Sequence, residues 1–379
     1  TLDQGMRILD EAITGLTDQV IPGAIIFKLY DTYGFPADLT GDIARERNLL
    51  LDMPGFESEM SQQRNRARAA SKFQGEGGEE FEIDAETVFL GYETLDVTAS
   101  VTVIHDGNGF VDSWSGQGAV SVVLDQTPFY AESGGQVGDR GSLVAGGLVM
   151  SVLDTKKSGK AIVHYCQSEN GVLAVGDPVR AVVSPSVRQN TARHHSATHL
   201  LHAALRVVLG DHVNQRGSLV SADRLRFDFS HFEGVTAEEL QAIEHLCNQE
   251  ILKNTAISTE VMSVEAAKER GAMALFGEKY SESVRVLTMG DGFSMELCGG
   301  THALRTGDLG LLRVLSEQGI ASGVRRIEAV VGEQALSAIA ETEAFASAVS
   351  AALKTDRGAS LARLEQVMEH NRRLEKEVA

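Results

Sequence analysis

The spacing of apolar residues divides the chain into helical and extended regions. Over residues 1–74 apolar side chains recur every three or four positions, which predicts helices. Over residues 81–183 short runs rich in Val, Ile and Leu alternate with turns of Gly, Asp and Asn, which predicts a small antiparallel β-barrel. The runs that predict its strands are 101–104, 119–124, 143–153, 161–165 and 179–183.

Turn and cap residues organise the first region further. Gly34 and Pro36 predict a turn between two helices. We expect one helix over 40–48, capped by Thr40, and another over 56–73. The Gly- and Glu-rich composition of residues 74–80 predicts a linker to the barrel.

The region after the barrel mixes both periodicities. A helix is predicted over 191–209, capped by Ser184, Asn190 or Thr191 and ended by Gly210. Alternation over 212–220 and 224–230 predicts a hairpin. Later patterns predict helices over 236–253 and 264–270, and strands of a second sheet over 257–261, 283–289, 293–297, 311–318 and 324–330.

From Glu333 the chain is rich in Ala and Glu and is predicted to be helical. A heptad seam follows its end, at Leu364, Val367, Asn371, Leu374 and Val378. Two interpretations stay open: a helix packed on its own domain, and a coiled-coil surface through which the chain self-associates.

Composition narrows the class of protein. The chain has 379 residues, 43% of them apolar, and we see no signal peptide and no apolar run as long as a membrane span. The three cysteines, Cys166, Cys247 and Cys298, form no disulfide framework. We therefore expect a cytoplasmic protein with no membrane partner. A net charge of −19 disfavours indiscriminate nucleic-acid binding but leaves room for a specific RNA held by local basic patches.

Two ligand-spaced pairs predict a metal site. His195 and His199 are four residues apart, as are Cys298 and His302, and on a helix that spacing places both side chains on one face. Three imidazoles and a thiolate suit a tetrahedral divalent metal, most often zinc. The alternative is a set of core histidines with a buried thiol, which the glycines after Cys298 disfavour. His202 is expected in the core or beside the ligands.

Two further stretches are candidates for nucleic-acid contact. Gly134, Gly135 and Gln136 offer bare backbone N–H groups and one amide, which could approach a nucleotide or an ester closely. A plain hairpin loop is the competing interpretation. Arg64, with Arg66 and Arg68, fans around a predicted helix, either as a solvated face or as a contact to an RNA backbone.

With these pieces placed, the chain resembles the alanyl-tRNA synthetase family over essentially its whole length. The motifs that carry the resemblance are residues 30–40, 127–139, 195–202, 271–280, 296–302 and 323–328. The resemblance implies an α+β multidomain architecture. It divides into the end of a helical tRNA-recognition domain (1–75), a small β-barrel (81–185), a zinc-containing editing domain of the threonyl/alanyl-tRNA synthetase second-additional-domain type (186–331) and the start of a helical linker (332–379).

The resemblance also implies that the chain is a piece of a longer protein. The family's aminoacylation domain would precede Thr1, and both ends of the chain look like cuts. The longer protein would attach alanine to tRNA(Ala) with ATP. This piece would hydrolyse mischarged Ser-tRNA(Ala) and Gly-tRNA(Ala).

Site residues follow from the resemblance position by position. His195, His199, Cys298 and His302 match ligands of one zinc ion, while Thr198, Gln215 and Ser218 match positions that bear on recognition and hydrolysis of the wrong amino acid. The loop of Gly134, Gly135 and Gln136 would approach the CCA end of the tRNA. Asp31 would read a G–U pair of the acceptor stem, and Arg64 and Arg68 would also contact the tRNA.

Physical chemistry refines these roles. Thr198 lies between two ligands of one helix, so its hydroxyl is either near the metal or bonded back to a helix carbonyl. Gln215 and Ser218 are three apart, so both can face the metal only if a bulge or turn at Arg216 and Gly217 interrupts the strand. Four protein ligands close a tetrahedral site, which favours zinc as an organiser, whereas a loose Cys298 would admit water. Two other functions stay open: a zinc-stabilised tRNA-binding module, and a free-standing deacylase, which the helical stretch before residue 81 disfavours.

Overall fold

The computed structural model describes residues 7–9, 12–14, 16, 19–33, 37–47, 49–56, 58–60, 83–273 and 283–378. Near the N-terminus, helices α2 (Gly23–Tyr33) and α3 (Ala37–Glu46) accompany a parallel pair of short strands, β1 (Val20–Ile21) and β2 (Leu50–Leu51). Most of the predicted helix over 56–73 lies outside the described residues. Thr40 does not cap a helix as predicted: it is buried inside α3, because the good helix formers Ala37 and Leu39 extend that helix toward its N-terminus.

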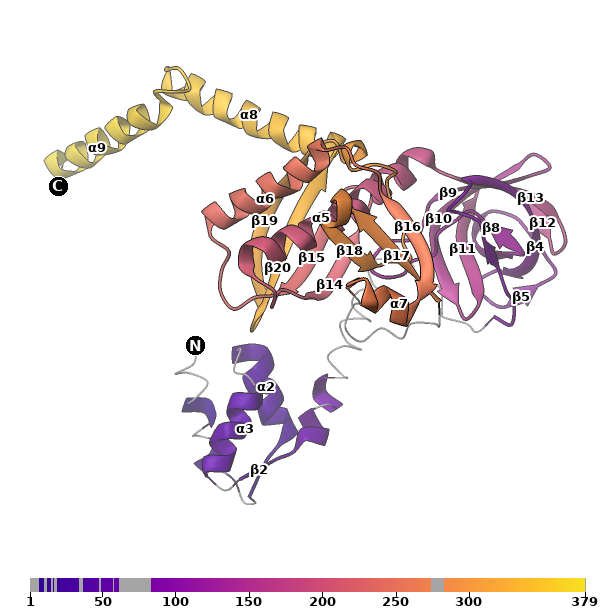
Figure 1. Ribbon diagram of the computed structural model, residues 1–379, viewed down its shortest axis with the longest axis horizontal. Helices are drawn as coiled ribbons and strands as arrows, with labels where there is room; N and C mark the ends of the chain where they lie inside the picture. The colour runs from indigo at the N-terminus through magenta and orange to yellow at the C-terminus, as the bar shows by residue number, and fades with distance from the viewer. Residues whose placement is uncertain are drawn as a thin grey trace.

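The predicted barrel is confirmed. Six strands close into an antiparallel barrel in the order β13-β9-β10-β11-β7-β4, and β4 pairs back to β13 (Figure 1). Val122, Leu124, Leu143 and Met150 are among the side chains that fill its interior. The strands are β4 (Asp96–His105), β7 (Gly118–Leu124), β9 (Gly141–Ala145), β10 (Leu148–Ser158), β11 (Ala161–Ser168) and β13 (Pro178–Val183), with the shorter β3 (Val88–Phe89), β5 (Phe110–Val111), β6 (Ser113–Ser115), β8 (Gln126–Thr127) and β12 (Val172–Ala174) around them.

One barrel strand was predicted wrongly. The apolar run over 143–153 is not a single strand, because the chain reverses at Gly146 and Gly147, with φ of 52° and 93°. Positive φ at both central residues of a two-residue hairpin loop requires glycine-like freedom. The glycine pair therefore signals the hairpin more strongly than the flanking apolar residues signal one long strand.

The region that follows the barrel is built on helix α5 (Pro185–Leu209). Ser184 has the extended backbone of an N-cap and Pro185 occupies the first turn, so the helix begins six residues before the predicted start at 191. Its buried Leu200, Leu201 and Leu205 pack with α6 (Ala237–Leu252) against a four-stranded sheet. That sheet has the order β14 (Gln215–Val220), β15 (Leu225–Ser230), β20 (Val324–Val331) and β19 (Leu312–Ala321).

A separate three-stranded sheet corrects the expectation of a single second sheet. It comprises β16 (Ser258–Ser263), β17 (Ser283–Met289) and β18 (Ser294–Leu297), with α7 (Val264–Glu269) beside it and the short turns η1 (Gly290–Gly292) and η2 (Thr306–Leu309). Helix α5 contacts both sheets, which fits a helix buried over most of its circumference (Figure 1). The end of β18 thereby lies against the histidine-bearing face of α5.

The chain ends in two helices, α8 (Glu333–Leu353) and α9 (Ser360–Val378), which project away from the sheets (Figure 1). No residue that is described in α9 is buried, so this helix is not packed on its own domain, and the coiled-coil interpretation of its seam stays a prediction. Helix α8 is long and apolar enough, by length and composition alone, to cross a membrane, contrary to the expectation from the sequence that no run approached that length. Its richness in alanine explains the difference.

Candidate metal centre

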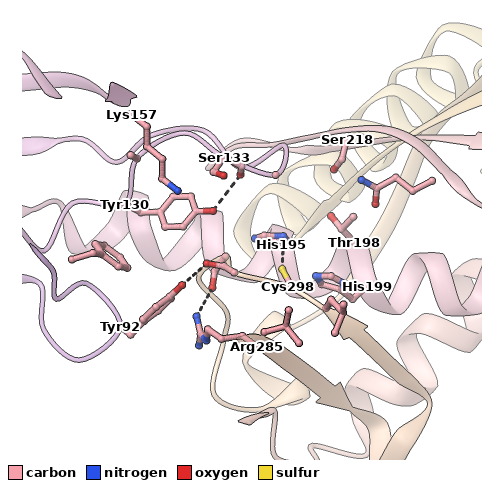
Figure 2. A pocket seen from close by; sticks show the side chains of 18 of the residues that line it. Tyr92, Tyr130, Ser133, Lys157, His195, Thr198, His199, Ser218, Arg285 and Cys298 are labelled. Carbon is pink, nitrogen blue, oxygen red and sulfur yellow. Dashed lines mark hydrogen bonds between the residues drawn. The ribbon is translucent and has the colours of Figure 1, made fainter. Parts of the chain in front are cut away.

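Four metal-capable side chains meet where α5 faces the loop after β18. His195 and His199 lie one turn apart on α5, and Cys298 and His302 lie in the loop. One donor atom from each of the four lies within 4.8 Å of the others. The two pairs that the sequence predicted to form one site are therefore adjacent in space. Figure 2 shows three of the four residues, His195, His199 and Cys298.

A buried amide fixes the orientation of His195. The backbone N–H of Thr301 donates to Oε1 of Gln136 at 3.0 Å, which identifies that atom as the oxygen, and the amide nitrogen of Gln136 donates to Thr301 Oγ1 at 2.9 Å. Nδ1 of His195, 2.7 Å from the same Oε1, must then carry a proton and donate. The lone pair of its Nε2 faces the cluster, where Cys298 Sγ lies 3.5 Å away.

A buried carboxylate fixes the orientation of His199. Glu296 accepts from Nδ1 of His199 at 2.8 Å and from Nδ1 of His202 at 2.9 Å. Nε2 of His199 is buried and has no hydrogen-bond partner among the residues that the structure describes. A buried nitrogen left without a partner is costly unless something absent binds it, and a metal ion fits that need. His202 lies beside the ligands, as expected.

The third imidazole completes the pattern. Nδ1 of His302 lies 3.3 Å from the hydroxyl of Ser196, and its Nε2 lies 3.3 Å from Cys298 Sγ. All three imidazoles thus engage the protein through Nδ1 and present Nε2 to the cluster. Three imidazole nitrogens and one thiolate form a donor set that fits a tetrahedral zinc ion.

Charge within the cluster favours the thiolate. Burial opposes ionisation of Cys298, but the imidazoles of His195 and His302 outweigh it and hold the pKa of the thiol well below its usual value. Burial lowers the pKa of His302 to about 3. Burial also disfavours the charged forms of His199 and Glu296, yet their mutual attraction prevails, raising the pKa of His199 to about 10 and lowering that of Glu296 to about 2.

The cluster opens into a cavity of about 380 Å³. Three of the four donors line it, as do Thr198, Gln215 and Ser218. The register of β14 against β15 shifts between Gln215 and Gly217, which is the bulge that the sequence required for both side chains to face one cavity. The hydroxyl of Thr198 donates to the carbonyl of His194 at 2.8 Å while the residue lines the cavity.

The glycine-rich loop of the barrel contributes in an unexpected way. Gly134 lines the cavity, and Gly135, with φ of 85°, packs so closely on Ser218 that a Cβ would lie 2.7 Å from its carbonyl oxygen. Gln136 has no exposed surface and bonds within the metal centre. Arg64 and Arg68 lie outside the described residues, as does the side chain of Asp31, whose backbone lies in α2.

Several residues that sequence reasoning missed join the barrel to the metal centre. Arg188 of α5 forms a buried ion pair with Asp139 and donates to the carbonyls of Gly91 and Pro128. The hydroxyl of Tyr92 donates to Gly299 O at 2.5 Å, beside Cys298. Of the missed residues, Glu296 could most readily have been found from the sequence, because it lies two positions before Cys298 in a predicted strand.

Comparison with known proteins places the chain. The family model of class II (A) tRNA synthetases matches residues 1–187, and that of the threonyl and alanyl tRNA synthetase second additional domain matches residues 284–328. Over 378 residues the chain is 53% identical to the alanine–tRNA ligase of Pseudomonas fluorescens, and over 381 residues 52% identical to that of Nitrosococcus oceani. These matches cover 100% of the chain but only 43% and 44% of the relatives. The chain belongs to the alanyl-tRNA synthetase family.

Proposed function

We propose that this chain hydrolyses the ester that joins serine or glycine to the terminal ribose of tRNA(Ala), and so removes misattached amino acids. One observation carries the proposal: a single cavity joins the four-donor cluster to the polar side chains of Thr198, Gln215 and Ser218. The match of residues 284–328 to the second additional domain supports the same assignment, with an editing domain over 186–331.

The need for such a second site follows from the size and polarity of the side chains of alanine, glycine and serine. A pocket shaped for alanine cannot exclude the smaller glycine, and it rejects one added hydroxyl only weakly. A site that hydrogen-bonds a hydroxyl discriminates in the opposite sense, because bound alanine leaves its polar groups unpaired, at roughly 1–3 kcal/mol for each. Selection of serine is thereby explained, whereas glycine enters the proposal through the family resemblance alone.

The side chains around the cavity suit that task. The hydroxyl of Thr198 donates its hydrogen bond to the carbonyl of His194, so toward the cavity its oxygen can only accept. The hydroxyl or the ammonium group of a seryl substrate can donate to it. The amide of Gln215 and the hydroxyl of Ser218 have no hydrogen-bond partner among the described residues and face the same cavity. The backbone N–H of Gly134 is equally free in the described structure and could donate to the ester oxygen.

One zinc ion would be held by His195, His199, Cys298 and His302. When bound, it would supply a positive centre that organises the loop and orients the amino group of the substrate or a water molecule. The protein groups around it engage the three imidazoles through Nδ1 and direct each Nε2 at the cluster, where a metal would take the place of any proton on that nitrogen.

For the whole protein we propose attachment of alanine to tRNA(Ala) with ATP in the cytoplasm, which fits the name alanine–tRNA ligase that its relatives carry. The acceptor stem and CCA end of that tRNA are the proposed partner, with residues 1–75 as a portion of the tRNA-recognition domain. Residues 332–379 would be the start of a helical linker, and helix α9 within them is a proposed surface for self-association.

The test is release of amino acid from charged tRNA. The purified chain, loaded with zinc, should free serine from Ser-tRNA(Ala) and leave Ala-tRNA(Ala) intact. Cys298→Ala should lose this deacylation and retain tRNA binding, whereas Cys166→Ala, a control in the barrel core, should keep both. No release of serine together with intact binding would favour a zinc-stabilised tRNA-binding module, and hydrolysis by Cys298→Ala at the parent rate would refute the metal-centred site.

A further inference from the structure

One wall of the cavity is aromatic and comes from the barrel side. The ring of Phe89 lies 4.9 Å from that of Tyr92 and 6.0 Å from that of Tyr130, edge-on to both. All three line the cavity, and we refer to them as the aromatic wall. Figure 2 shows the two tyrosines at one end of the cavity and Thr198 and Ser218 at the other, with His195 and Cys298 between them.

Two cations at the aromatic end form no ion pair with any carboxylate that the structure describes. Lys157 lines the cavity, is exposed, and has no ion-pair partner within the portion of the chain that the structure describes. Arg285 lies over the ring of Tyr92, 3.5 Å from its centroid, and among the described residues it donates to the neutral oxygens of Gly300 and Thr259. In a chain with a net charge of −19, two unbalanced cations at one cavity indicate a negatively charged ligand.

Rings and cations in this combination match a nucleotide. A base presents a flat π face that stacks on aromatic side chains, and its phosphate pairs with lysine or arginine. Tyr92 keeps 48% of its surface exposed although Arg285 covers one face of its ring, which leaves area for a stacked base. The opposite end of the cavity, beyond His195 and Cys298, carries Thr198 and Ser218, whose hydroxyls suit an amino acid.

We propose that the aromatic wall and Lys157 form a subsite for the terminal nucleotide of the substrate, with the base stacked on Tyr92 and the 5′-phosphate at Lys157. This inference rests on the proposed function, because the nucleotide is the RNA end of the ester that the metal centre would cleave. The bond from Tyr92 to Gly299 holds the subsite at a fixed distance from Cys298. The barrel thereby contributes substrate-binding residues.

The experiment measures binding of adenosine 5′-monophosphate and of adenosine to the zinc-loaded chain, by equilibrium titration followed with ligand-observed NMR. The parent should bind the monophosphate more tightly than the nucleoside. Lys157→Ala should abolish that preference and leave adenosine binding unchanged. Lys156→Ala is the matched control, because the neighbouring lysine on β10 pairs with Asp154 and does not line the cavity.

The aromatic wall has its own pair of variants. Tyr92→Leu should weaken binding of both compounds by about 5- to 100-fold, as expected for loss of one stacked base. Tyr92→Phe keeps the ring and removes the bond to Gly299, so it should retain most of the binding. Loss of binding in Tyr92→Phe as severe as in Tyr92→Leu would show that the hydroxyl bond, not stacking, matters, and would overturn the subsite.

Failure of the subsite and failure of the proposed function are distinguishable. If the parent binds neither compound, or if both Lys157→Ala and Tyr92→Leu bind them as the parent does, the subsite is wrong even where Ser-tRNA(Ala) is hydrolysed. If binding follows the expected pattern but no serine is released from Ser-tRNA(Ala), the subsite is supported and the proposed hydrolytic function is refuted.

Discussion

Gln136 and His195 share a 2.7 Å hydrogen bond between Oε1 and Nδ1, although 59 residues separate them in the sequence. The amide comes from a loop of the barrel and the imidazole from α5. A residue that belongs to the barrel therefore fixes the tautomer of a candidate zinc ligand. Because Gln136 is fully buried, its position suits this task better than contact with a tRNA.

Gln136→Ala should lower zinc affinity by about 10- to 100-fold, which is typical for loss of a hydrogen bond that orients a ligand. Without the amide, the Nδ1 proton of His195 loses its acceptor, and the ring is free to turn or to protonate Nε2. Competition with a chromophoric chelator measures the affinity. Gln136→Glu keeps an acceptor for Nδ1 and for Thr301 N–H, so it should restore much of the loss.

Gln167→Ala provides the comparison for that variant, because this exposed barrel glutamine touches neither the metal centre nor the cavity. It should bind zinc as the parent does. Equal zinc affinity in Gln136→Ala and Gln167→Ala would mean that the amide does not position His195. Equal losses in Gln136→Ala and Gln136→Glu would point to packing alone.

Removal of the metal should expose one reactive thiol. Among the three cysteines, Cys166 and Cys247 are buried in separate cores, and burial raises the pKa of both thiols. Cys298 is partly exposed, and neighbouring imidazoles hold its pKa well below the usual value, so the metal-free form carries a thiolate, the nucleophilic form. Iodoacetamide should then modify one cysteine per native chain after chelation, as read by intact mass.

Zinc added before the reagent should suppress that modification, and the modified residue should map to Cys298. Cys298→Ala should give an unmodified native chain under both conditions. Modification of two or three cysteines in the native chain would contradict the burial of Cys166 and Cys247. A rate unaffected by zinc would contradict the assignment of Cys298 as a ligand.

Contacts between residues that are close in the sequence could be predicted at this centre, whereas contacts between residues far apart in the sequence could not. The ligand pairs and the bulge between Gln215 and Ser218 could be predicted, because helix and strand geometry fix which neighbours share a face. The bond from Tyr92 to Gly299 spans 207 residues and could not be predicted, since no local spacing reports a contact between segments so far apart in the sequence. Gln136 falls between these cases: its loop was recognised, but its burial and its bonds to His195 and Thr301 were not predicted.

The fold shows the same division. The closed barrel followed from alternating runs and turns, whereas the separation of β16, β17 and β18 from the second sheet did not. Strand pairing depends on which surfaces of α5 remain to be covered, and the sequence of a strand does not specify its partner. The boundaries of elements differ from the predicted ones where glycines reverse the chain, at Gly146 and Gly147. They also differ at Ser184, where a helix begins earlier than its apolar pattern predicts.

Acid should destabilise the barrel through His164. This histidine is fully buried, donates from Nδ1 to Val122 O at 2.9 Å and accepts at Nε2 from the hydroxyl of Thr127 at 2.7 Å. Burial lowers its pKa from 6.5 to about 4. Between these values the unfolded chain binds a proton that the folded chain excludes, so the free energy of unfolding falls as the pH falls from 6.5 toward 4.

From pH 7 to pH 5 this one group should lower the free energy of unfolding by about 2 kcal/mol. The free energy of unfolding of His164→Gln should therefore fall by about 2 kcal/mol less than that of the parent over the same range. Urea unfolding followed by the fluorescence of Trp114 measures it, because the single tryptophan of the chain lies in the barrel core. An identical pH dependence in the parent and the variant would show that His164 does not exclude its proton.

The ion pair between Arg188 and Asp139 should hold α5 to the barrel. Both side chains are buried, and the guanidinium also donates to two barrel-side carbonyls, at Gly91 and Pro128. Arg188→Met leaves the Asp139 carboxylate buried without its counter-charge, so the free energy of unfolding should fall by about 3–5 kcal/mol. Urea unfolding at pH 7 measures this loss.

An exposed pair of the same kind provides the control. Arg180 and Asp96 also join through two guanidinium nitrogens, but on the solvent-facing surface of the barrel, so Arg180→Met should change stability far less. Adding Asp139→Asn to Arg188→Met removes the unpaired charge and should recover some of the loss. If Arg188→Met and Arg180→Met cost equally little, the buried pair is not what holds the ligand-bearing helix against the barrel.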